Sequence, residues 1–375
     1  MRILLTCHVR FASAMAWYTF HLARGLIQQG HGVFLFAQRN SPLSQRAKTE
    51  GIFGDFDRRF HSSDPLEIAR SARALGRAIR EFEPDVLNPH CPPGHAYLAF
   101  VNKGRLPLIR TVAEPRSPKG NAMNKLIHER RTDGMIYSTG SSLPRYERVF
   151  LFQNTLQRVV PAGLDLSMFP PVDRGTFREQ LAIPEHALFA AIVARMNPEK
   201  GQELLIDALA MLPEETRKQM VILLTGDDNQ QRTAADLKQY ARSRSVDEHL
   251  RFLPRLPDIR PLLTEIDLGI ITSVRSEAVC RIALEYMAYS KPIISTDVNV
   301  LPEVVYNNVN GWVVSSTNPQ ELADALVSAL KHRRDLPEFG KRGRDLLNAQ
   351  FTLEQMTSKT LDFYREVETQ HGQRK

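Results

Sequence analysis

The sequence alternates short apolar runs with amphipathic helical stretches, and this alternation limits the possible folds more than any other feature. Residues 2–6 and 32–37 are short and apolar, which predicts two strands. Between them, residues 17–29 carry apolar side chains at helical spacing and stop before a glycine, which predicts a helix. A strand, helix, strand order favours parallel strands joined by a right-handed crossover. The N-terminal half is therefore predicted to be an α/β unit.

The alternation continues through the first half and starts again after about residue 173. Two successive units of this kind predict two doubly wound, Rossmann-like domains, whose ligands bind at the carboxyl ends of the strands. We expect the two domains to face each other across a ligand-binding cleft. Further strands are expected at 85–88, 106–112, 134–138, 188–194, 221–225, 250–253, 268–272, 292–295 and 311–314, and further helices at 65–82, 201–211, 234–243, 261–265, 281–289 and 353–369.

The boundary between the two patterns is predicted at residues 162–173, inside a stretch with three prolines and two glycines. We expect an N-terminal domain over residues 1–165 and a C-terminal domain over 166–352. The last helix, within residues 353–375, is expected to pack back toward the N-terminal domain. A length of 375 residues suits two or three domains.

Composition excludes several classes of protein. The chain is 42% hydrophobic and 24% charged, as in ordinary globular proteins, and not as in disordered or fibrous ones. No apolar run approaches the roughly 20 residues that cross a bilayer. Three scattered cysteines are too few for a disulfide framework, and the first apolar run is too short for a secretory signal. We therefore expect a cytoplasmic protein.

Charge is distributed unevenly between the two halves. Up to Asp165 there are 23 basic and 13 acidic residues, a net charge of +10, whereas the remainder carries 26 basic and 29 acidic residues, a net charge of −3. Such asymmetry indicates that the first half faces an anionic partner. Nucleic acid, an anionic membrane, a phosphorylated substrate and a merely solvated surface all fit the charge alone.

Two cations follow a predicted strand of the second half. Arg195 and Lys200 lie between the strand at 188–194 and the helix that starts near Gly201. The carboxyl end of a parallel strand is where a ligand lies, and the helix start offers unpaired N–H groups and a positive dipole end. This arrangement suits a diphosphate, although two surface cations in an ordinary loop give the same pattern.

Two carboxylates follow a later strand in the same way. Glu277 lies in the loop after the strand at 268–272, and Glu285 lies about one turn into the next helix. Carboxylates in these places can accept hydrogen bonds from the hydroxyl groups of a sugar and of a ribose. The alternative is one capping and one exposed helical glutamate.

These residues, taken with further segments in order, resemble the retaining, two-domain glycosyltransferases of family 4, also called group 1, of the bacterial surface-glycan type. That family has the GT-B fold, in which two Rossmann-like domains face each other. The resemblance covers nearly all of residues 160–330. It is carried by Arg195, Lys200-Gly201, Glu277, Glu285, Pro302-Glu303-Val304-Val305, Asn310-Gly311, and the segments 161–169 and 250–263.

The resemblance implies a role for each residue. Arg195 and Lys200 would bind the donor diphosphate, Glu277 would contact the transferred sugar, and Glu285 would hold the ribose. The helix start after Glu277 would add donor contacts, and the segment that holds Leu253 would frame the base. The donor-binding set is then Arg195, Lys200, Leu253, Glu277, Val279, Cys280, Arg281 and Glu285.

The chain also departs from the family pattern. The usual Glu-Gly-Phe-Gly is Glu277-Ala278-Val279-Cys280, so both loop glycines are absent and side chains would narrow the pocket. The glycine usual before the proline of the next strand is Ser290. The loop after the first strand, residues 10–15, holds no glycine either. The sequence therefore does not determine how closely this loop approaches a phosphate.

The acceptor side is less defined. The histidine usual after the fourth N-terminal strand is missing, and Glu114 and Arg116 occupy its place. His90 follows the preceding strand, so either His90 or Glu114 would orient the acceptor hydroxyl, and both are candidate catalytic residues. Arg116 and Ser13 are expected on the acceptor side. Residues 116–131 hold five Lys or Arg among apolar side chains, which suits an anionic bilayer, a phosphorylated acceptor or a solvated helix face.

Neither a cofactor nor a metal is expected. Asp227 and Asp228 follow a strand and would suit Mg²⁺, but cations of the protein take that role in the resembled family. Cys91 with His90 and His95 lacks the paired spacing of a zinc site.

The expected function is transfer of a sugar from a nucleoside diphosphate sugar, with retention of configuration, to an anionic glycan or lipid-linked acceptor. Lipopolysaccharide or cell-surface polysaccharide synthesis is the expected setting, with peripheral contact on the inner face of an anionic membrane. Alternatives are a nucleotide-sugar epimerase or hydrolase of the same fold, and a basic nucleotide-binding protein without transferase activity. An oxidoreductase needs a glycine fingerprint that residues 6–15 lack, and a nucleic-acid partner is not expected, because base-stacking aromatics do not interleave with the cations.

Overall fold

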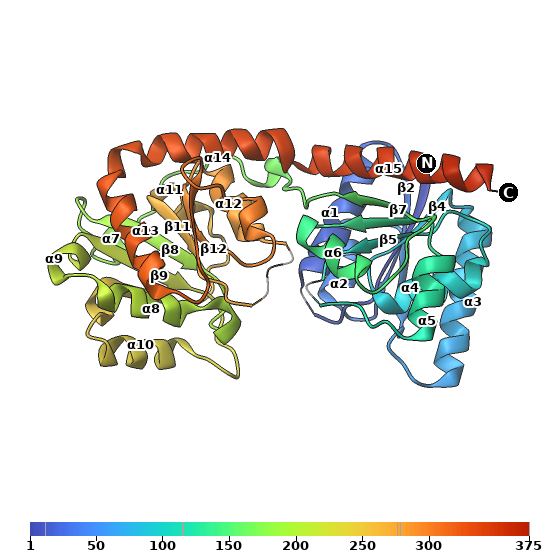
Figure 1. Cartoon of the computed structure of the whole chain (residues 1–375), viewed down its shortest axis with the longest axis horizontal. Helices are drawn as coiled ribbons and strands as arrows, with labels where there is room; N and C mark the ends of the chain where they lie inside the picture. The colour runs from blue at the N-terminus through green and yellow to red at the C-terminus, as the bar shows by residue number, and fades with distance from the viewer. Residues whose placement is uncertain (12, 115, 276, 278, 375) are drawn as a thin grey trace. The chain divides into compact units, whose positions relative to one another are not determined.

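The computed structural model describes residues 1–11, 13–114, 116–275, 277 and 279–374 (Figure 1). The chain divides into two compact units. Unit 1 comprises Met1–Asp165 together with Gln350–Lys375, and unit 2 comprises Leu166–Ala349. Each unit is an α/β assembly built on parallel strands.

Unit 1 contains a four-stranded sheet in the order β3-β2-β1-β4 and a three-stranded sheet in the order β5-β6-β7. All pairings in both are parallel. An isolated parallel bridge between Leu87 and Leu108 joins the two sheets side by side. The strands are β1 (Arg2–Cys7), β2 (Gly32–Gln38), β3 (Gly54–Arg58), β4 (Val86–Pro89), β5 (Ile109–Val112), β6 (Gly134–Tyr137) and β7 (Leu156–Val159).

Several helices of unit 1 begin where a capping side chain satisfies a free N–H group. Ser13 accepts a hydrogen bond from the N–H of Ala16 at the start of α1, and Asp64 caps α3 ahead of Pro65. The helices are α1 (Ala14–Gln28), α2 (Pro42–Thr49), α3 (Pro65–Phe82), α4 (Pro92–Asn102), α5 (Ala122–Lys125), the π-helix η1 (Leu126–Arg130), the 3₁₀ helix η2 (Gly140–Ser142), α6 (Leu143–Glu147) and α15 (Leu353–Gln373).

The C-terminal helix α15 is part of unit 1 and packs on α1. Gly25 of α1 allows this close approach, because a Cβ there would collide with the side chain of Thr357. Further along α15, the hydroxyl of Tyr364 donates a hydrogen bond of 2.7 Å to Oδ1 of Asn88, next to the end of β4. A residue 276 positions away in the sequence thus anchors that strand.

Unit 2 contains one six-stranded parallel sheet in the order β10-β9-β8-β11-β12-β13. The strand order reverses between β8 and β11, and in such a sheet this is the switch point where ligands bind. The strands are β8 (Leu188–Val193), β9 (Met220–Thr225), β10 (Leu250–Leu253), β11 (Leu268–Ile271), β12 (Ile293–Thr296) and β13 (Gly311–Val314).

Helices flank this sheet, and α8 packs against α13 over a buried apolar cluster that includes Leu205, Leu209, Leu322 and Leu326. Each pair is spaced i, i+4, which places both side chains on one helix face. The helices are α7 (Phe177–Gln180), α8 (Gln202–Met211), α9 (Glu214–Arg217), α10 (Ala234–Ser243), α11 (Arg260–Glu265), α12 (Arg281–Ala288), α13 (Pro319–Lys331) and α14 (Leu336–Gln350), with the 3₁₀ turns η3 (Leu166–Met168), η4 (Pro198–Lys200), η5 (Asp247–His249), η6 (Leu301–Glu303) and η7 (Arg333–Asp335).

The predicted α/β class with parallel sheets is confirmed, and the predicted strands occur within a few residues of their expected positions. Two strands were not predicted. The edge strand β3 reads Gly-Asp-Phe-Asp-Arg and β7 reads Leu-Gln-Arg-Val, so neither forms an apolar run. Residues 116–131 contain one turn of α-helix followed by a π-helix. They therefore do not form the continuous amphipathic helix that would lie along a membrane.

Candidate functional site

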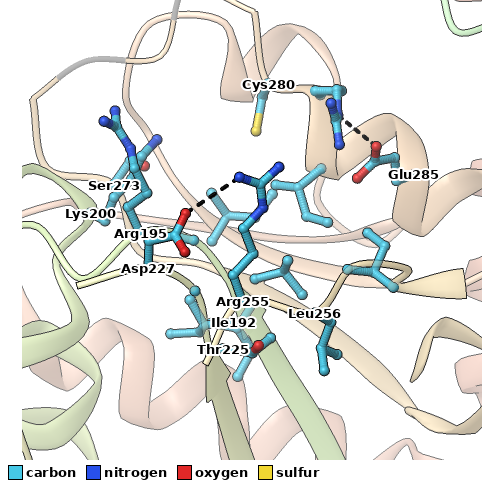
Figure 2. A pocket seen from close by; sticks show the side chains of 18 of the residues that line it. Ile192, Arg195, Lys200, Thr225, Asp227, Arg255, Leu256, Ser273, Cys280 and Glu285 are labelled. Carbon is cyan, nitrogen blue, oxygen red and sulfur yellow. Dashed lines mark hydrogen bonds and ion pairs between the residues drawn. The ribbon is translucent and has the colours of Figure 1, made fainter. Parts of the chain in front are cut away.

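A pocket of about 760 Å³ opens in unit 2 at the carboxyl ends of β8, β9 and β11, beside the switch point of the sheet (Figure 2). Ile192, Thr225 and Ile271 mark the three strand ends in its wall. The loops that follow these strands supply its polar side chains. Most of the residues expected to bind the donor line this pocket: Arg195, Lys200, Glu277, Val279, Cys280, Arg281 and Glu285.

Arg195 follows β8 and is exposed at the pocket. Its main chain is fixed, because the side-chain amide of Gln202 donates a hydrogen bond of 2.8 Å to its carbonyl oxygen. Its guanidinium makes no hydrogen bond or ion pair with any residue that the structure describes (Figure 2). Arg195 therefore has its full charge available for an anion.

Lys200 is brought to the same pocket by a close approach of two loops. Gly201 has φ +61°, and a Cβ there would collide with the carbonyl oxygen of Thr272 after β11. The hydroxyl of Thr272 in turn donates a hydrogen bond of 2.7 Å to the carbonyl oxygen of Lys200. Glycine at position 201 thus lets the β8 loop reach the β11 loop.

Glu277 comes from that second loop and is buried in the pocket wall. Its Oε1 forms an ion pair with Nζ of Lys200. The same oxygen accepts a hydrogen bond of 2.6 Å from the hydroxyl of Ser273. The ion pair therefore joins Lys200, which is predicted to bind the diphosphate, directly to Glu277, which is predicted to bind the sugar.

Glu285 lies on α12, and its side chain is almost fully buried. Burial raises its pKa above the usual value, whereas its ion pair with Arg281 acts in the opposite direction. Nε of Arg281 lies 2.6 Å from Oε1 of Glu285, at i, i+4 spacing on the helix (Figure 2). The pair keeps a carboxylate in a largely apolar wall, where an unpaired charge is costly.

The residues between the two glutamates give the pocket a side-chain wall. Val279 and Cys280 are buried and line it. Burial raises the pKa of the Cys280 thiol well above its usual value, so this sulfur is neutral. Ala278, the other position where the sequence lacks an expected glycine, lies outside the described residues, as do Ala12, Pro115 and Ser276.

The segment 250–263, which was predicted to frame the base, lines the pocket through its later part. Leu253 ends β10 and is absent from the pocket lining among the described residues, whereas the stretch from Arg255 to Arg260 forms one wall. Arg255 reaches toward Asp227, with Nη1 3.5 Å from Oδ2, across the pocket (Figure 2). Arg255 was not predicted from the sequence, although its position just after a strand was an available signal.

The charges of the pocket nearly cancel. The described lining residues include five cations and four carboxylates. Each carboxylate is paired with a cation: Asp227 with Arg255, Asp258 with Arg260, Glu277 with Lys200 and Glu285 with Arg281. Arg195 carries the remaining net charge. An entering anion therefore meets one free guanidinium and several cations that it must share with carboxylates.

Asp227 and Asp228, considered for Mg²⁺, point to different partners. Asp227 faces Arg255, and Oδ1 of Asp228 accepts a hydrogen bond of 2.7 Å from the N–H of Ala234. Within the described residues, no group of three His, Cys, Asp or Glu is arranged to hold a metal ion.

The acceptor-side candidates lie in unit 1, and Arg110 forms an ion pair with one of them, Glu114. This arginine is buried, and its Nη2 lies 2.7 Å from Oε1 of Glu114. The hydroxyl of Tyr146 also donates to that oxygen, at 3.2 Å. His90 is fully buried, Nε2 lies 2.8 Å from Oδ1 of Asn88, and Nδ1 has no partner within the described chain. Burial, and then the charge of Arg110, hold the pKa of His90 well below its usual value.

The other two acceptor-side candidates are separate from this cluster. Ser13 uses its hydroxyl oxygen as the cap of α1. Arg116 is exposed and makes no ion pair or hydrogen bond within the described residues. Neither is joined to His90 or Glu114 by a contact that the structure describes.

Comparison with known proteins identifies two matching sequence families. The family described as glycosyl transferases group 1 matches residues 173–346, and Glycosyltransferase Family 4 matches residues 15–167. Together the matches span most of both units, and the first includes all the described pocket-lining residues except Met168 and Phe169.

Curated relatives carry the name D-inositol 3-phosphate glycosyltransferase. The protein of Geodermatophilus obscurus is 32% identical over 365 residues, which covers 88% of this chain and 80% of the relative. That of Kribbella flavida is 26% identical over 351 residues, or 84% and 82% of the two chains. That of Actinosynnema mirum is 34% identical over a shorter stretch of 177 residues, which covers 45% of this chain and 42% of the relative.

Solved structures share the fold. A glycosyltransferase of Rickettsia africae superposes with a TM-score of 0.85 at 18% identity, over 98% of both chains. Alr3699/HepE of Anabaena in complex with UDP gives a TM-score of 0.82 at 20% identity, over 98% of this chain and all of that one. At such identities the likeness concerns the arrangement of the backbone.

Proposed function

The chain belongs to the glycosyltransferases of group 1 and family 4, and on this premise we propose that it moves a sugar from a nucleoside diphosphate donor to a glycan or lipid-linked acceptor, with retention of configuration. The observation that carries the proposal is the pocket of unit 2. It brings Arg195, whose side chain is unpaired among the described residues, together with Lys200, Glu277 and Glu285 at the switch point of a parallel sheet. The solved complexes with UDP and UDP-glucose in related folds support a nucleotide-sugar donor.

Arg195 and Lys200 are assigned to the diphosphate. Breaking the bond between the sugar and the diphosphate places negative charge on the leaving phosphate. Cations that line a pocket stabilise that charge as it develops. Arg195 is available at once, whereas Lys200 must loosen its ion pair with Glu277. We propose that these side chains replace a metal ion and that no cofactor is needed.

Glu285 is assigned to the ribose and Glu277 to the transferred sugar. A ribose hydroxyl that donates to Glu285 would compete with Arg281 and free that guanidinium for the phosphate. Val279 and Cys280 provide the neighbouring apolar wall. Donor binding thus exchanges ion pairs within the protein for contacts to the ligand.

The acceptor is proposed to bind at unit 1. The excess positive charge up to Asp165 favours an anionic glycan or lipid-linked acceptor. His90 is neutral and its Nδ1 has no partner within the described chain, but its side chain is fully buried, whereas Glu114 is partly exposed and receives hydrogen bonds from Arg110 and Tyr146. We therefore propose that either His90, after a local rearrangement, or Glu114 orients the acceptor hydroxyl, and that Arg116 and Ser13 contact other parts of the acceptor.

The proposed setting is bacterial surface-polysaccharide or lipopolysaccharide synthesis, in the cytoplasm or on the inner face of the membrane. None of the helices that the structure describes is both long enough and apolar enough to cross a bilayer. The basic charge of unit 1 supports peripheral attachment to an anionic surface.

The decisive experiment screens UDP, GDP, ADP and dTDP sugars by thermal shift and then measures turnover with and without acceptor. A donor that binds raises the unfolding temperature in proportion to the logarithm of its concentration over its Kd. Transfer that requires an acceptor supports the proposal. Product without an acceptor would favour an epimerase or hydrolase, and nucleotide binding with no turnover on any glycan or lipid-linked acceptor would favour a binding protein.

Two conservative variants separate the glutamate roles. Glu285→Gln should weaken binding of the bare nucleoside diphosphate, because its partner is the ribose. Glu277→Gln should spare the bare nucleotide and weaken the intact donor, because its partner is the sugar. Calorimetric titration with both ligands decides, and equal losses for both ligands in both variants would contradict the assignments.

A further inference from the structure

Glu277 uses only one of its two carboxylate oxygens within the protein. Oε1 receives both the ammonium of Lys200 and the hydroxyl of Ser273, the latter at 2.6 Å. Oε2 has no partner among the residues that the structure describes. A carboxylate offers about four acceptor positions, so the Oε2 side remains for hydroxyl groups of a ligand.

The main chain of Glu277 is held from a different loop. Its N–H donates a hydrogen bond of 3.1 Å to Oδ1 of Asn299, and its carbonyl oxygen accepts one of 3.3 Å from the N–H of Val300. Asn299 lies after β12 with φ 49°, a conformation that asparagine tolerates better than most residues. Its side chain therefore fastens the Glu277 loop to the neighbouring strand end.

The contacts of Glu277 with Lys200, Ser273 and Asn299 are expected to respond differently when a donor binds. A diphosphate competes with Glu277 for the charge of Lys200, and the ion pair weakens as the phosphate contact forms. Ser273 is buried in the pocket wall and its hydroxyl already donates to Oε1, so this hydrogen bond does not depend on the charge of Lys200 and can persist. The Asn299 side chain contacts the main-chain N–H of Glu277 and does not involve Lys200, so this contact can persist as well.

We propose that Ser273 and Asn299 are positioning residues, which hold Glu277 in place for the transferred sugar while Lys200 turns to the diphosphate. The inference rests on the proposed function, because it requires a nucleoside diphosphate sugar as ligand. It predicts that the two residues matter for the sugar and little for the nucleotide.

The chain offers a matched control for each residue. Ser273→Ala removes the hydroxyl that reaches Glu277, and Ser295→Ala removes an equally buried hydroxyl that has no partner within the described residues. Asn299→Gly keeps the positive φ and removes the amide. Asn308→Gly does the same at φ 60°, where the side chain makes no hydrogen bond that the structure describes.

The experiment titrates each variant of the full chain with paired probes: UDP-glucose and UDP, GDP-mannose and GDP, ADP-glucose and ADP, and dTDP-glucose and dTDP. For the pair that binds the unaltered protein, Ser273→Ala should weaken the sugar nucleotide by about 10-fold, the effect of one hydrogen bond to a charged group, and Asn299→Gly by about 5-fold, the effect of one hydrogen bond between neutral groups. Binding of the matching bare nucleotide should stay within about 2-fold. The Ser295 and Asn308 variants should match the unaltered protein for both probes.

Other outcomes would overturn the inference in recognisable ways. Equal weakening of sugar nucleotide and bare nucleotide would assign Ser273 and Asn299 a general structural role. Unchanged binding in both variants, with turnover intact, would show that Lys200 alone positions Glu277 and would leave the transferase proposal standing. If the unaltered protein binds none of the probes, the proposed function fails and this inference fails with it.

Discussion

The ion pair of Arg281 with Glu285 predicts a stability change whose pH dependence can be worked out. Replacing Arg281 with glutamine leaves a buried carboxylate without its cation. Breaking a fully buried pair in this way costs about 3–5 kcal/mol. The Arg281 side chain is 53% exposed, so solvent already screens part of the attraction, and we expect a loss of about 1–2 kcal/mol at pH 8.

The sign of the pH dependence follows from the raised pKa of Glu285. Because burial raises this pKa, the folded protein binds more protons than the unfolded chain between the unfolded and folded pKa values. Stability therefore falls as the pH rises through that window. Without Arg281 the pKa rises further, so the Arg281→Gln variant should lose less stability at pH 5 than at pH 8.

Thermal unfolding at both pH values tests this reasoning. For a unit of this size, about 1–2 kcal/mol corresponds to a fall in Tm of about 2–8 °C. Adding Glu285→Gln to the Arg281 variant should restore much of the loss at pH 8. Lys218→Gln is the matched control, because Lys218 is also 53% exposed and pairs at i, i+4, but with the exposed Glu214. Equal losses at both pH values, or no recovery in the double variant, would refute the reasoning.

Three further predictions concern activity and binding. Arg195→Ala and Lys200→Ala should each lower kcat/KM by about 10²-fold or more, about 2.7 kcal/mol at the transition state, and near-normal turnover in both would remove them from the site. EDTA should leave turnover unchanged; a loss that Mg²⁺ or Mn²⁺ restores would contradict the metal-free proposal. In co-sedimentation at low salt, the protein should bind anionic vesicles but not neutral ones. The triple variant Lys125→Gln, Arg130→Gln and Arg131→Gln should weaken the binding to anionic vesicles, because each cation contributes about 1 kcal/mol. Protein that stays in solution with anionic vesicles at low salt would end the membrane proposal.

Apolar periodicity predicted the elements that have a strong hydrophobic signature. Residues 188–193 and 221–224 form continuous apolar runs, and they lie in the interior strands β8 and β9. The sequence does not predict strands β3 and β7, because their polar residues interrupt the apolar pattern that marks a strand. These segments are strands because β3 pairs with β2 and β7 pairs with β6. The irregular helix at 122–130 also depended on packing, since its sequence is compatible with an ordinary helix.

The candidate site could be predicted as a set of residues but not as a set of contacts. Spacing on one helix permits the pairing of Arg281 with Glu285, because residues four apart lie on the same face. The sequence gives no measure of the burial that makes this pair consequential. That burial follows from the packing of α12 in its unit.

The sequence by itself determined the parallel α/β architecture and which loops carry charge, since both follow from local patterns of apolar and polar residues. Only the tertiary structure decided which charges meet. Lys200 and Glu277 are 77 positions apart, and Asp227 and Arg255 are 28 apart. Strand order places their loops at one edge of the sheet, and the close approach at Gly201 completes the first pair. Such contacts depend on the pairing of strands distant in sequence. Together with the local pairs of Asp258 with Arg260 and of Glu285 with Arg281, they leave Arg195 as the one cation with an unshared charge among the described residues of the pocket.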